Sequence, residues 1–573
     1  MGQERHSAAA NTKETDIFLP TTKKEVEQLG WDRPDIILVT SDAYIDSPQV
    51  GVAVIGKYLT KHGFNVAVIG QPSTLKDTDI TRLGEPKLFW GVTGGCIDSM
   101  VANHTALKKF RNQDDYTPGG VNKRPNRACL AYTNLIRRNY KSSKPIVLGG
   151  LEASLRRIAH YDYWDDAVRR SILFDSKADI IAYGMAEKTT LELTRAFRDS
   201  ADWRNIRGIC YASDAPGENL IELPPFEEVR DNKRKFFTMF NQFYRNCDDP
   251  QAGFFQKHNE KYLIHNPPQP ELTTGELDEI YELSFERDAH PFYKTGEIRA
   301  LETVRQSITS HRGCFGQCSF CSIAAHQGRR VVSRSPESVI REAKHISHMK
   351  GFNGIIYDVG GPTANMYATA CLKGGAPCKN RSCLTPQPCD KLKYGHDTQM
   401  KLLQEIMNIA KVKKVFISTG IRYDMVVNDK QSGPQYVAQL VKHHISGQIK
   451  VAPEHYDNEV LQLMNKPSIK PLMRFKAMFD DAVKAIGKKY FLTYYLIAAH
   501  PGCTINHMFK LKDFLRGGIK TTPEQVQIFT PTPSTLSAAM YWCETDPQGN
   551  KIFVEKNPFG KQKQKDLVRK QER

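Results

Sequence analysis

The stretch Cys314-Phe-Gly-Gln-Cys318-Ser-Phe-Cys321 decides the fold that we predict for this chain. Its C-x-x-x-C-x-x-C spacing predicts three thiolates around one iron-sulfur cube, with one iron left without a protein ligand. A structural cluster or a zinc site would close its coordination with a fourth side chain. The spacing therefore predicts a reactive iron that binds and reduces a sulfonium cofactor.

Zinc is the main alternative for these three cysteines. A closed zinc knuckle needs a fourth Cys or His at a suitable spacing, and the nearby candidates His311 and His326 complete no usual zinc pattern. An aromatic residue, Phe320, directly precedes the third cysteine, as in the radical S-adenosylmethionine (SAM) enzymes. We therefore favour a SAM-binding cluster and take Phe320 as a candidate cofactor contact.

The flanks extend this similarity. The stretches from Arg305 to Cys314 and from Cys321 to Arg330 resemble the radical SAM core of the YgiQ family. Further blocks agree with that family in chain order: Tyr116-Thr-Pro-Gly-Gly120, Val147-Leu-Gly-Gly-Leu-Glu-Ala-Ser154, Asp358-Val-Gly-Gly-Pro-Thr-Ala-Asn365, Lys450-Val-Ala-Pro-Glu-His455 and Phe529-Thr-Pro-Thr-Pro-Ser-Thr535. The resemblance implies a radical SAM enzyme whose reaction and catalytic residues are unassigned.

Composition predicts a soluble, cytoplasmic protein of several domains. The chain has 573 residues and 40% hydrophobic content, enough for about two to four domains with substantial cores. Residues 1–22 lack the apolar core of a signal peptide, and no apolar run approaches the length of a membrane helix. The 13 cysteines form no secreted disulfide scaffold and fit a reducing compartment.

The formal net charge of +17 allows a polyanionic partner. Residues 551–573 hold eight Lys or Arg against three Asp or Glu, and we favour a solvated terminus over a binding arm there. Other basic clusters occur at Lys123, Arg124 and Arg127, at Arg137, Arg138, Lys141 and Lys144, and at Arg329, Arg330 and Arg334. RNA is a permissible partner, but charge alone does not make it the substrate.

The N-terminal half alternates apolar runs with helical patterns. Behind an N-terminal extension (1–30), residues 31–214 predict a doubly wound, Rossmann-like parallel sheet whose strands end in glycines. In radical SAM proteins such a sheet resembles the cobalamin-binding domain. Here the stretch Ser41-Asp-Ala-Tyr-Ile-Asp46 lacks D-x-H-x-x-G, and so lacks the His that would bind cobalt. Cobalamin is therefore in doubt, although ligation without His stays open.

A connecting segment (215–295), a barrel (296–545) and a basic C-terminal tail (546–573) are expected to follow. Six strands separated by helices predict a partial (β/α)6 radical SAM barrel, so the fold class is α/β throughout. The expected strands are 306–310, 354–359, 414–419, 448–452, 490–498 and 526–530. Chemistry in such barrels lies just after the strands.

Residues at these strand ends are candidate SAM ligands. By resemblance, Gly360 and Gly361 hold the amino group of SAM. Ser418 and Arg422 are candidates for its carboxylate, because a guanidinium fork matches that geometry, and Glu454 for the ribose hydroxyls. Arg422 and Glu454 could equally be surface ion-pair partners.

A second group, Cys371, Cys378, Cys383 and Cys389, falls within 19 residues in a loop rich in Gly and Pro. Its x6, x4 and x5 spacings match no zinc ribbon closely. We favour an auxiliary iron-sulfur cluster or zinc over free thiols, and the sequence does not decide between the two metals.

The leading hypothesis is reductive cleavage of SAM to a 5'-deoxyadenosyl radical, with an external flavodoxin-like or ferredoxin-like one-electron reductant and an unknown substrate. RNA or protein modification is one use that the basic surface allows. Two alternatives from other classes are a non-catalytic iron-sulfur protein that transfers electrons or senses oxygen, and a metal-bearing RNA-binding protein.

Overall fold

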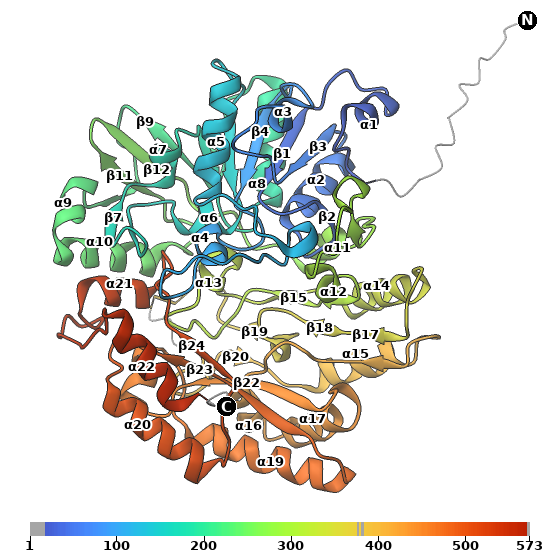
Figure 1. The fold of residues 1–573 in the computed structure, drawn as a ribbon, viewed down its shortest axis with the longest axis vertical. Helices are drawn as coiled ribbons and strands as arrows, with labels where there is room; N and C mark the ends of the chain where they lie inside the picture. Colours follow the sequence, from blue (N-terminus) through green and yellow to red (C-terminus); the bar gives the residue numbers. More distant parts are fainter. Residues whose placement is uncertain (1–17, 375–377, 380–382, 570–573) are drawn as a thin grey trace, which may run out of the picture.

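The computed structural model describes residues 18–374, 378–379 and 383–569. Two halves lie against each other (Figure 1). The first, blue to green, is built around one large sheet, and the second, yellow to red, is an arc of parallel strands with helices outside. None of the described helices has the length and apolar character required to cross a membrane.

Five parallel strands form the centre of the first sheet, in the order β3-β1-β4-β5-β8. They are β1 (Ile36–Thr40), β3 (Val66–Gly70), β4 (Phe89–Thr93), β5 (Ile146–Gly149) and β8 (Ile180–Ala182). Every residue of β1, β3 and β8 is buried, which explains their continuous apolar runs.

Helices cover both faces of this sheet. Ile36 and Leu38 of β1 pack in one core with α2 (Gly51–Lys61) and α8 (Glu187–Asp199). Ile37 and Val39 point the other way, into a core that includes α5 (Ala128–Asn139). The alternation of strand side chains thus produces the doubly wound arrangement predicted from the sequence.

The predicted boundary at residue 214 is wrong, because the sheet continues into the segment assigned as a connector. Three of its strands, β10 (Ile221–Leu223), β11 (Phe254–His258) and β12 (Lys261–His265), join the sheet through β9 (Ile209–Ser213). β11 and β12 form an antiparallel hairpin. The prolines that suggested a linker flank this hairpin and leave its ladder intact.

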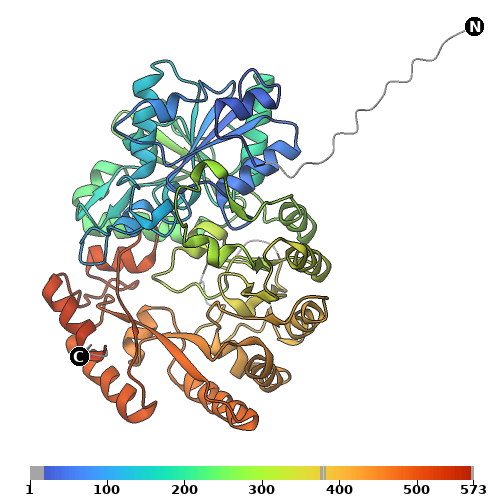
Figure 2. The same ribbon diagram turned by 45° about the vertical axis from the view of Figure 1, so that its right-hand side comes forward.

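The second half is the partial barrel. Its strands are β14 (Ser307–Thr309), β17 (Ile355–Ile356), β18 (Asp358–Gly360), β21 (Lys414–Val415), β22 (Gln448–Glu454), β23 (Phe491–Ala498) and β24 (Gln525–Ile528). Neighbouring strands pair in parallel, and a parallel bridge between Ile421 and Val451 continues the arc. Helices α14 (Pro336–His348), α15 (Asp397–Met407) and α19 (Lys470–Ile486) lie outside it (Figure 2).

The two predicted terminal segments are described in part. Residues 1–17 of the expected N-terminal extension lie outside the described residues, whereas 18–30 include α1 (Lys23–Gln28) with a capping box. At the other end, α22 (Pro558–Val568) packs on α20 (Ile505–Asp513). Lys561 is 2% exposed, and its Nζ donates to the hydroxyls of Tyr163 and Tyr541. The solvated-tail prediction was wrong because a Lys stem can be buried where its ammonium finds acceptors.

Candidate active site

The loop that carries Cys314, Cys318 and Cys321 is closed at its base by two short strands. β15 (His311–Arg312) pairs antiparallel with β16 (Val332–Ser333), and α13 (Ile323–Gln327) follows the third cysteine. Gly313 has φ +82°, and a Cβ there would lie 1.8 Å from the carbonyl oxygen of Arg330. Only glycine fits this crossing, so the backbone itself fixes the start of the loop.

Polar groups converge on two of the three sulfur atoms. The backbone N–H of Gly316 donates to Cys314 Sγ at 3.3 Å, and Thr363 Oγ1 lies 3.7 Å from the same atom. Arg422 Nη1 lies 3.7 Å from Cys318 Sγ. Burial raises the pKa of Cys314 and raises that of Cys321 to about 12. Burial alone favours the neutral thiols, whereas the Gly316 N–H and the Arg422 charge act in the opposite direction on Cys314. Such donors around sulfur fit the ligands of an iron-sulfur cluster.

Arg422 is one of the predicted site residues, but its fork is not free for a carboxylate. Asp424 accepts from Nε at 2.8 Å and from Nη2 at 2.6 Å, which leaves Nη1 toward Cys318. The Asn365 amide holds the backbone of Arg422 through both its N–H, at 2.7 Å, and its C=O, at 3.1 Å. The guanidinium is therefore anchored beside the cysteines as a buried ion pair, not at the surface.

Glu454 also lies in this group, at the end of β22, with φ +69° and 8% exposure. Burial raises the pKa of its carboxyl, against the lowering effect of Lys466 and Arg422. Its Oε1 is 4.0 Å from Lys466 Nζ. The Glu454 charge contributes to the raised pKa of Cys321. The structure therefore places Glu454 close to the cysteine loop.

Gly360, the last residue of β18, and Gly361 directly after it face the same region. The Gly360 carbonyl already accepts from Ser310 N at 2.6 Å and Ser310 Oγ at 3.1 Å, so it is not free for an ammonium group. A Cβ at Gly361 would lie 2.6 Å from His311 Nε2, a nitrogen 3.0 Å from the Thr363 carbonyl. Close packing therefore explains Gly361.

Two other predicted residues do not point into the site. Ser418 is exposed, and its hydroxyl donates to the Tyr357 carbonyl at 2.6 Å, whereas the next residue, Thr419, lines the cavity described below. Phe320 packs between the cores of both halves, and its ring makes a T-shaped contact with that of His500. The Phe320 side chain thus has a packing role in this structure.

A cavity of about 620 Å³ lies between the carboxyl edge of the large sheet and the mouth of the barrel. Its lining includes Asp42, Gly95, Gly149 and Glu187 from the first half and His311, Arg312, Gly361 and Thr419 from the second. Most of the remaining lining is apolar, including Leu38, Val50, Phe89, Val147, Ala182 and Ile308. Size and lining are those of a small-molecule site.

Two buried ion pairs at this cavity were not predicted from the sequence; Arg312, Glu187 and Asp42 line the cavity, and Arg124 lies behind Asp42. Arg312 Nη1 donates to Glu187 Oε1 at 2.6 Å, and Glu187 Oε2 has no hydrogen-bond partner among the described residues. Arg124 Nη2 donates to Asp42 Oδ1 at 2.6 Å. Arg312 directly precedes the cysteine loop, and a buried Arg requires an acidic partner. This requirement was the one sign of the pair in the sequence, and residue spacing could not identify Glu187 as the partner.

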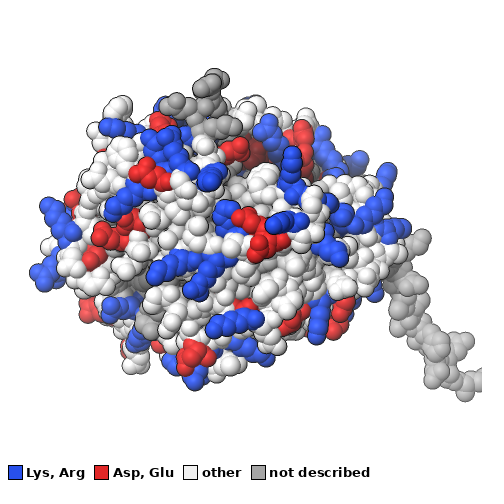
Figure 3. Space-filling model, turned by 90° about the horizontal axis from the view of Figure 1, so that it is seen from below, with Lys and Arg blue, Asp and Glu red and all other residues white. Residues whose placement is uncertain are grey.

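Part of the predicted basic surface is internal. Arg124, Arg329 and Arg334 are each under 5% exposed and form ion pairs, with Asp42, Asp248 and Glu342 respectively. Seen from below, the barrel half shows Lys and Arg scattered among Asp and Glu (Figure 3). The charge on this face is dispersed and forms no single basic stripe.

The second cysteine group lies beside the first. Cys371 ends β19 (Ala370–Cys371), which pairs with β20 (Leu392–Lys393), and all four cysteines are partly buried free thiols. Residues 375–377 and 380–382 of the same loop lie outside the description. Cys371, Cys383 and Cys389 pack on the same small apolar core as Cys314.

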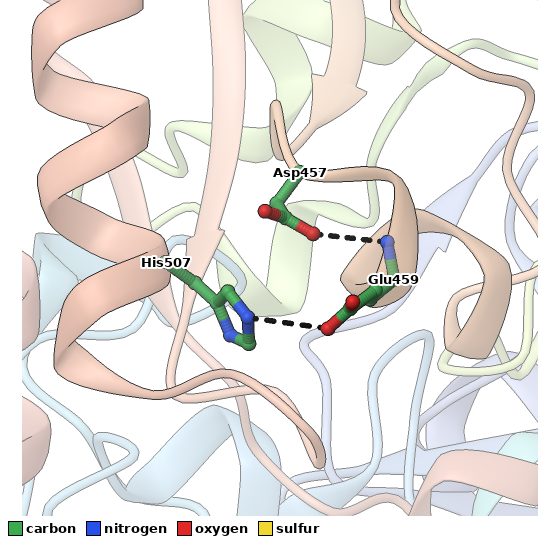
Figure 4. A group of neighbouring side chains, drawn as sticks. All are labelled: Asp457, Glu459 and His507. Atoms are coloured by element: carbon green, nitrogen blue, oxygen red, sulfur yellow. Dashed lines mark hydrogen bonds and ion pairs between the residues drawn. The ribbon is translucent and has the colours of Figure 1, made fainter.

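One further group of potential metal ligands consists of Asp457, Glu459 and His507 (Figure 4). Asp457 caps α18 (Asn458–Leu463) and already accepts from Lys510 Nζ at 2.7 Å. His507 Nε2 lies 3.6 Å from Glu459 Oε2. Because the Lys510 ammonium balances the Asp457 carboxylate, we assign no metal to this group.

Comparisons with known proteins match almost the entire chain. A family model described as Radical SAM N-terminal covers residues 18–307, and one described as Radical SAM superfamily covers 308–515. A UPF0313 protein of Fusobacterium nucleatum is 50% identical over 559 residues, spanning 96% of this chain and 98% of the relative. The chain belongs to the UPF0313 family. A UPF0313 protein of Thermotoga maritima is 46% identical over 568 residues, 96% of this chain and 98% of the relative.

This membership confirms the predicted YgiQ family, and the protein is a radical SAM enzyme. Among solved structures, the chain is similar to the radical S-adenosylmethionine methyltransferase TsrM of Kitasatospora setae. The TM-score is 0.52 at 13% identity, over 91% of this chain and 85% of that one. This likeness confirms the predicted fold, a doubly wound sheet followed by a radical SAM barrel.

Proposed function

We propose that Cys314, Cys318 and Cys321 hold the [4Fe-4S] cluster, and that the loops beside them bind SAM. The observation that carries this proposal is the convergence of Gly316 N–H and Arg422 Nη1 on the sulfur atoms of Cys314 and Cys318. When bound, the cluster supplies the electron for reductive cleavage of SAM to a 5'-deoxyadenosyl radical. The protein contributes binding, orientation and exclusion of water.

The roles of the other residues follow from where they lie. Gly361 and Thr419 line the cavity next to the cysteine loop and are our candidates for the amino end of SAM. Glu454, buried near Cys321, is the candidate for the ribose hydroxyls, since a carboxylate can accept from both. Arg422 acts as a fixed positive charge beside the thiolates, and Asp424 and Asn365 keep it in place.

The substrate is proposed to enter the cavity between the two halves. Its 620 Å³ and largely apolar lining favour a small molecule over a folded RNA, and Glu187 Oε2 offers a hydrogen-bond donor on that molecule an acceptor. Cobalamin without a His ligand stays an alternative occupant, which the absorbance of the purified protein would reveal. A flavodoxin-like or ferredoxin-like reductant and a reducing, cytoplasmic location complete the proposal, consistent with 13 free thiols.

The test is anaerobic incubation of the reconstituted protein with SAM and dithionite, followed by quantification of 5'-deoxyadenosine. Cys318→Ala should abolish the product and lower the iron content. Cys543→Ala, which changes a buried cysteine outside both groups, should retain both. Equal product from the Cys318→Ala and unmodified proteins would contradict the assignment.

A further inference from the structure

We propose that Cys371, Cys378, Cys383 and Cys389 hold a second iron-sulfur cluster, through which an electron-donor protein delivers electrons. The first step of the argument is convergence. Cys371 pairs with Leu392 across the β19–β20 ladder, and Cys389 N–H donates to the Cys383 carbonyl at 2.9 Å. The hairpin and this turn thus bring cysteines that are distant in sequence onto one face.

The second step is a direct connection to the first cysteine group. Gln317 lies between Cys314 and Cys318 in the sequence, yet its side-chain Nε2 donates to Cys383 Sγ at 3.2 Å. Arg329 Nη1 lies 3.4 Å from Gln317 Oε1 and donates to the Cys378 carbonyl at 3.1 Å. The two groups therefore share one hydrogen-bonded network.

The shared environment is both apolar and electropositive. Cys314 and three cysteines of the second group contact one core, formed by Phe315, Met366, Leu384, Leu392 and Met425. Lys373 Nζ lies 3.4 Å from Cys378 Sγ, and the Gln317 amide donates to Cys383 Sγ at 3.2 Å. Hydrogen-bond donors and cations of this kind surround the sulfur ligands of protein metal sites.

The spacing of the sulfur atoms distinguishes the two metals. Zinc binds each thiolate at about 2.3 Å and draws four of them into one tetrahedron. In the described part of the chain, no three of these four sulfur atoms lie within 4.8 Å of one another. A four-iron cube holds its thiolates farther apart, because each binds a different corner. The arrangement thus favours an iron-sulfur cluster over zinc.

The position of this group at the surface indicates its role, which rests on the proposed function of the first group. Four lysines around it are exposed, against the single exposed acid Asp390 in the same stretch: Lys373, Lys379, Lys391 and Lys393. A positive rim attracts an acidic one-electron donor of the flavodoxin or ferredoxin class. One electron leaves the reduced donor, which is oxidised, and the second cluster is reduced by one electron.

The proposed second cluster is tested by measuring iron and acid-labile sulfide in the anaerobically reconstituted full-length protein. We expect about eight irons per chain, and about four in the Cys378→Ala/Cys383→Ala protein. The Cys314→Ala/Cys318→Ala/Cys321→Ala protein should also keep about four and still show an iron-sulfur EPR signal after reduction. Four irons in the unmodified protein, or one zinc per chain that is lost with Cys378 and Cys383, would overturn the proposal.

The role has a separate readout, the ratio of SAM cleavage supported by reduced flavodoxin to that supported by dithionite. Lys391→Glu/Lys393→Glu should lower this ratio at least tenfold and steepen its dependence on salt. Lys484→Glu/Lys488→Glu, near the end of α19, is the matched control. An unchanged ratio would overturn the role as electron entry. Loss of cleavage with both reductants in the unmodified protein would instead contradict the function proposed for the first group.

Discussion

Gly313 and Gly328, at the two ends of the cysteine loop, both have positive φ angles, 82° and 94°. Only Gly313 lies against other backbone; a Cβ at Gly328 would have no neighbour within 4 Å among the described atoms. Gly328 has φ 94° and ψ 162°, a backbone region essentially limited to glycine, so we expect Gly328→Ala to cost about 1 to 3 kcal/mol of backbone strain. Gly313→Ala must additionally displace the Arg330 carbonyl and should lower the iron bound per chain by up to about half, the share of the cluster on the first cysteine loop. Equal iron contents in the two variants would contradict this account.

His258 is expected to make stability depend on pH. It is 2% exposed, its ring stacks on Phe226, and burial lowers its pKa to about 3. The unfolded chain therefore binds a proton below pH 6.5 that the folded state does not, so stability falls as the pH falls from 6.5 toward 3. Between pH 7 and pH 5 the loss is about 2 kcal/mol.

His258→Phe retains the stacking and removes this protonation. Urea unfolding at pH 7 and pH 5 should show a smaller acid loss in this variant than in the unmodified protein. His348→Phe, at an exposed position, is the control and should keep the full loss. An identical pH dependence in all three proteins would show that His258 does not contribute.

At the scale of elements, α22 joins the two halves of the molecule. Lys561 lies on it, with Nζ 4.9 Å from the ring centroids of both Tyr163 and Tyr541. Lys561→Ala removes two hydrogen bonds, two cation-π contacts and a buried stem, so we expect a loss of about 2 to 3 kcal/mol in urea unfolding. Lys563→Ala, exposed on the same helix, should change stability by less than about 0.5 kcal/mol.

The elements that the sequence predicted well are those with a continuous apolar pattern. Residues 491–498 form a strand close to the predicted 490–498, and residues 36–40 form a strand inside the predicted sheet, because strand and burial coincide in both. The β11–β12 hairpin was missed since prolines surround it, and α22 since its Lys-rich sequence hides a buried face. In both, tertiary contacts outweigh local composition.

At the scale of the whole molecule, the buried pair of Arg312 and Glu187 spans the two halves. Glu187→Gln leaves a buried guanidinium without a counter-charge, and we expect it to cost about 3 kcal/mol or more in urea unfolding. Arg312→Met should cost a similar amount. The double variant should be less destabilised than the sum of the two, since it removes both charges; strict additivity would show that they do not interact.

Much of the candidate site was predictable where it is local in sequence, as for Cys314, Cys318 and Cys321. Residues contributed by distant elements were harder to predict. The Thr419 side chain lines the cavity, whereas that of the neighbouring Ser418 points away from it. Sequence periodicity could not show which of two adjacent residues faces the cavity. Glu187 lies 125 residues before its partner, and no local pattern marks it.

The cysteine loop is attached to the first half of the molecule as well as to the barrel. Arg157 Nη1 donates to the Ala325 carbonyl at 3.3 Å, and His326 Nδ1 lies 3.1 Å from Ser154 Oγ. A hinge motion wide enough to admit a bulky molecule would break these bonds. Such an opening would also detach the cysteine loop from the first half of the molecule. An open state that admits a bulky molecule and a closed state that forms the radical would therefore exclude each other.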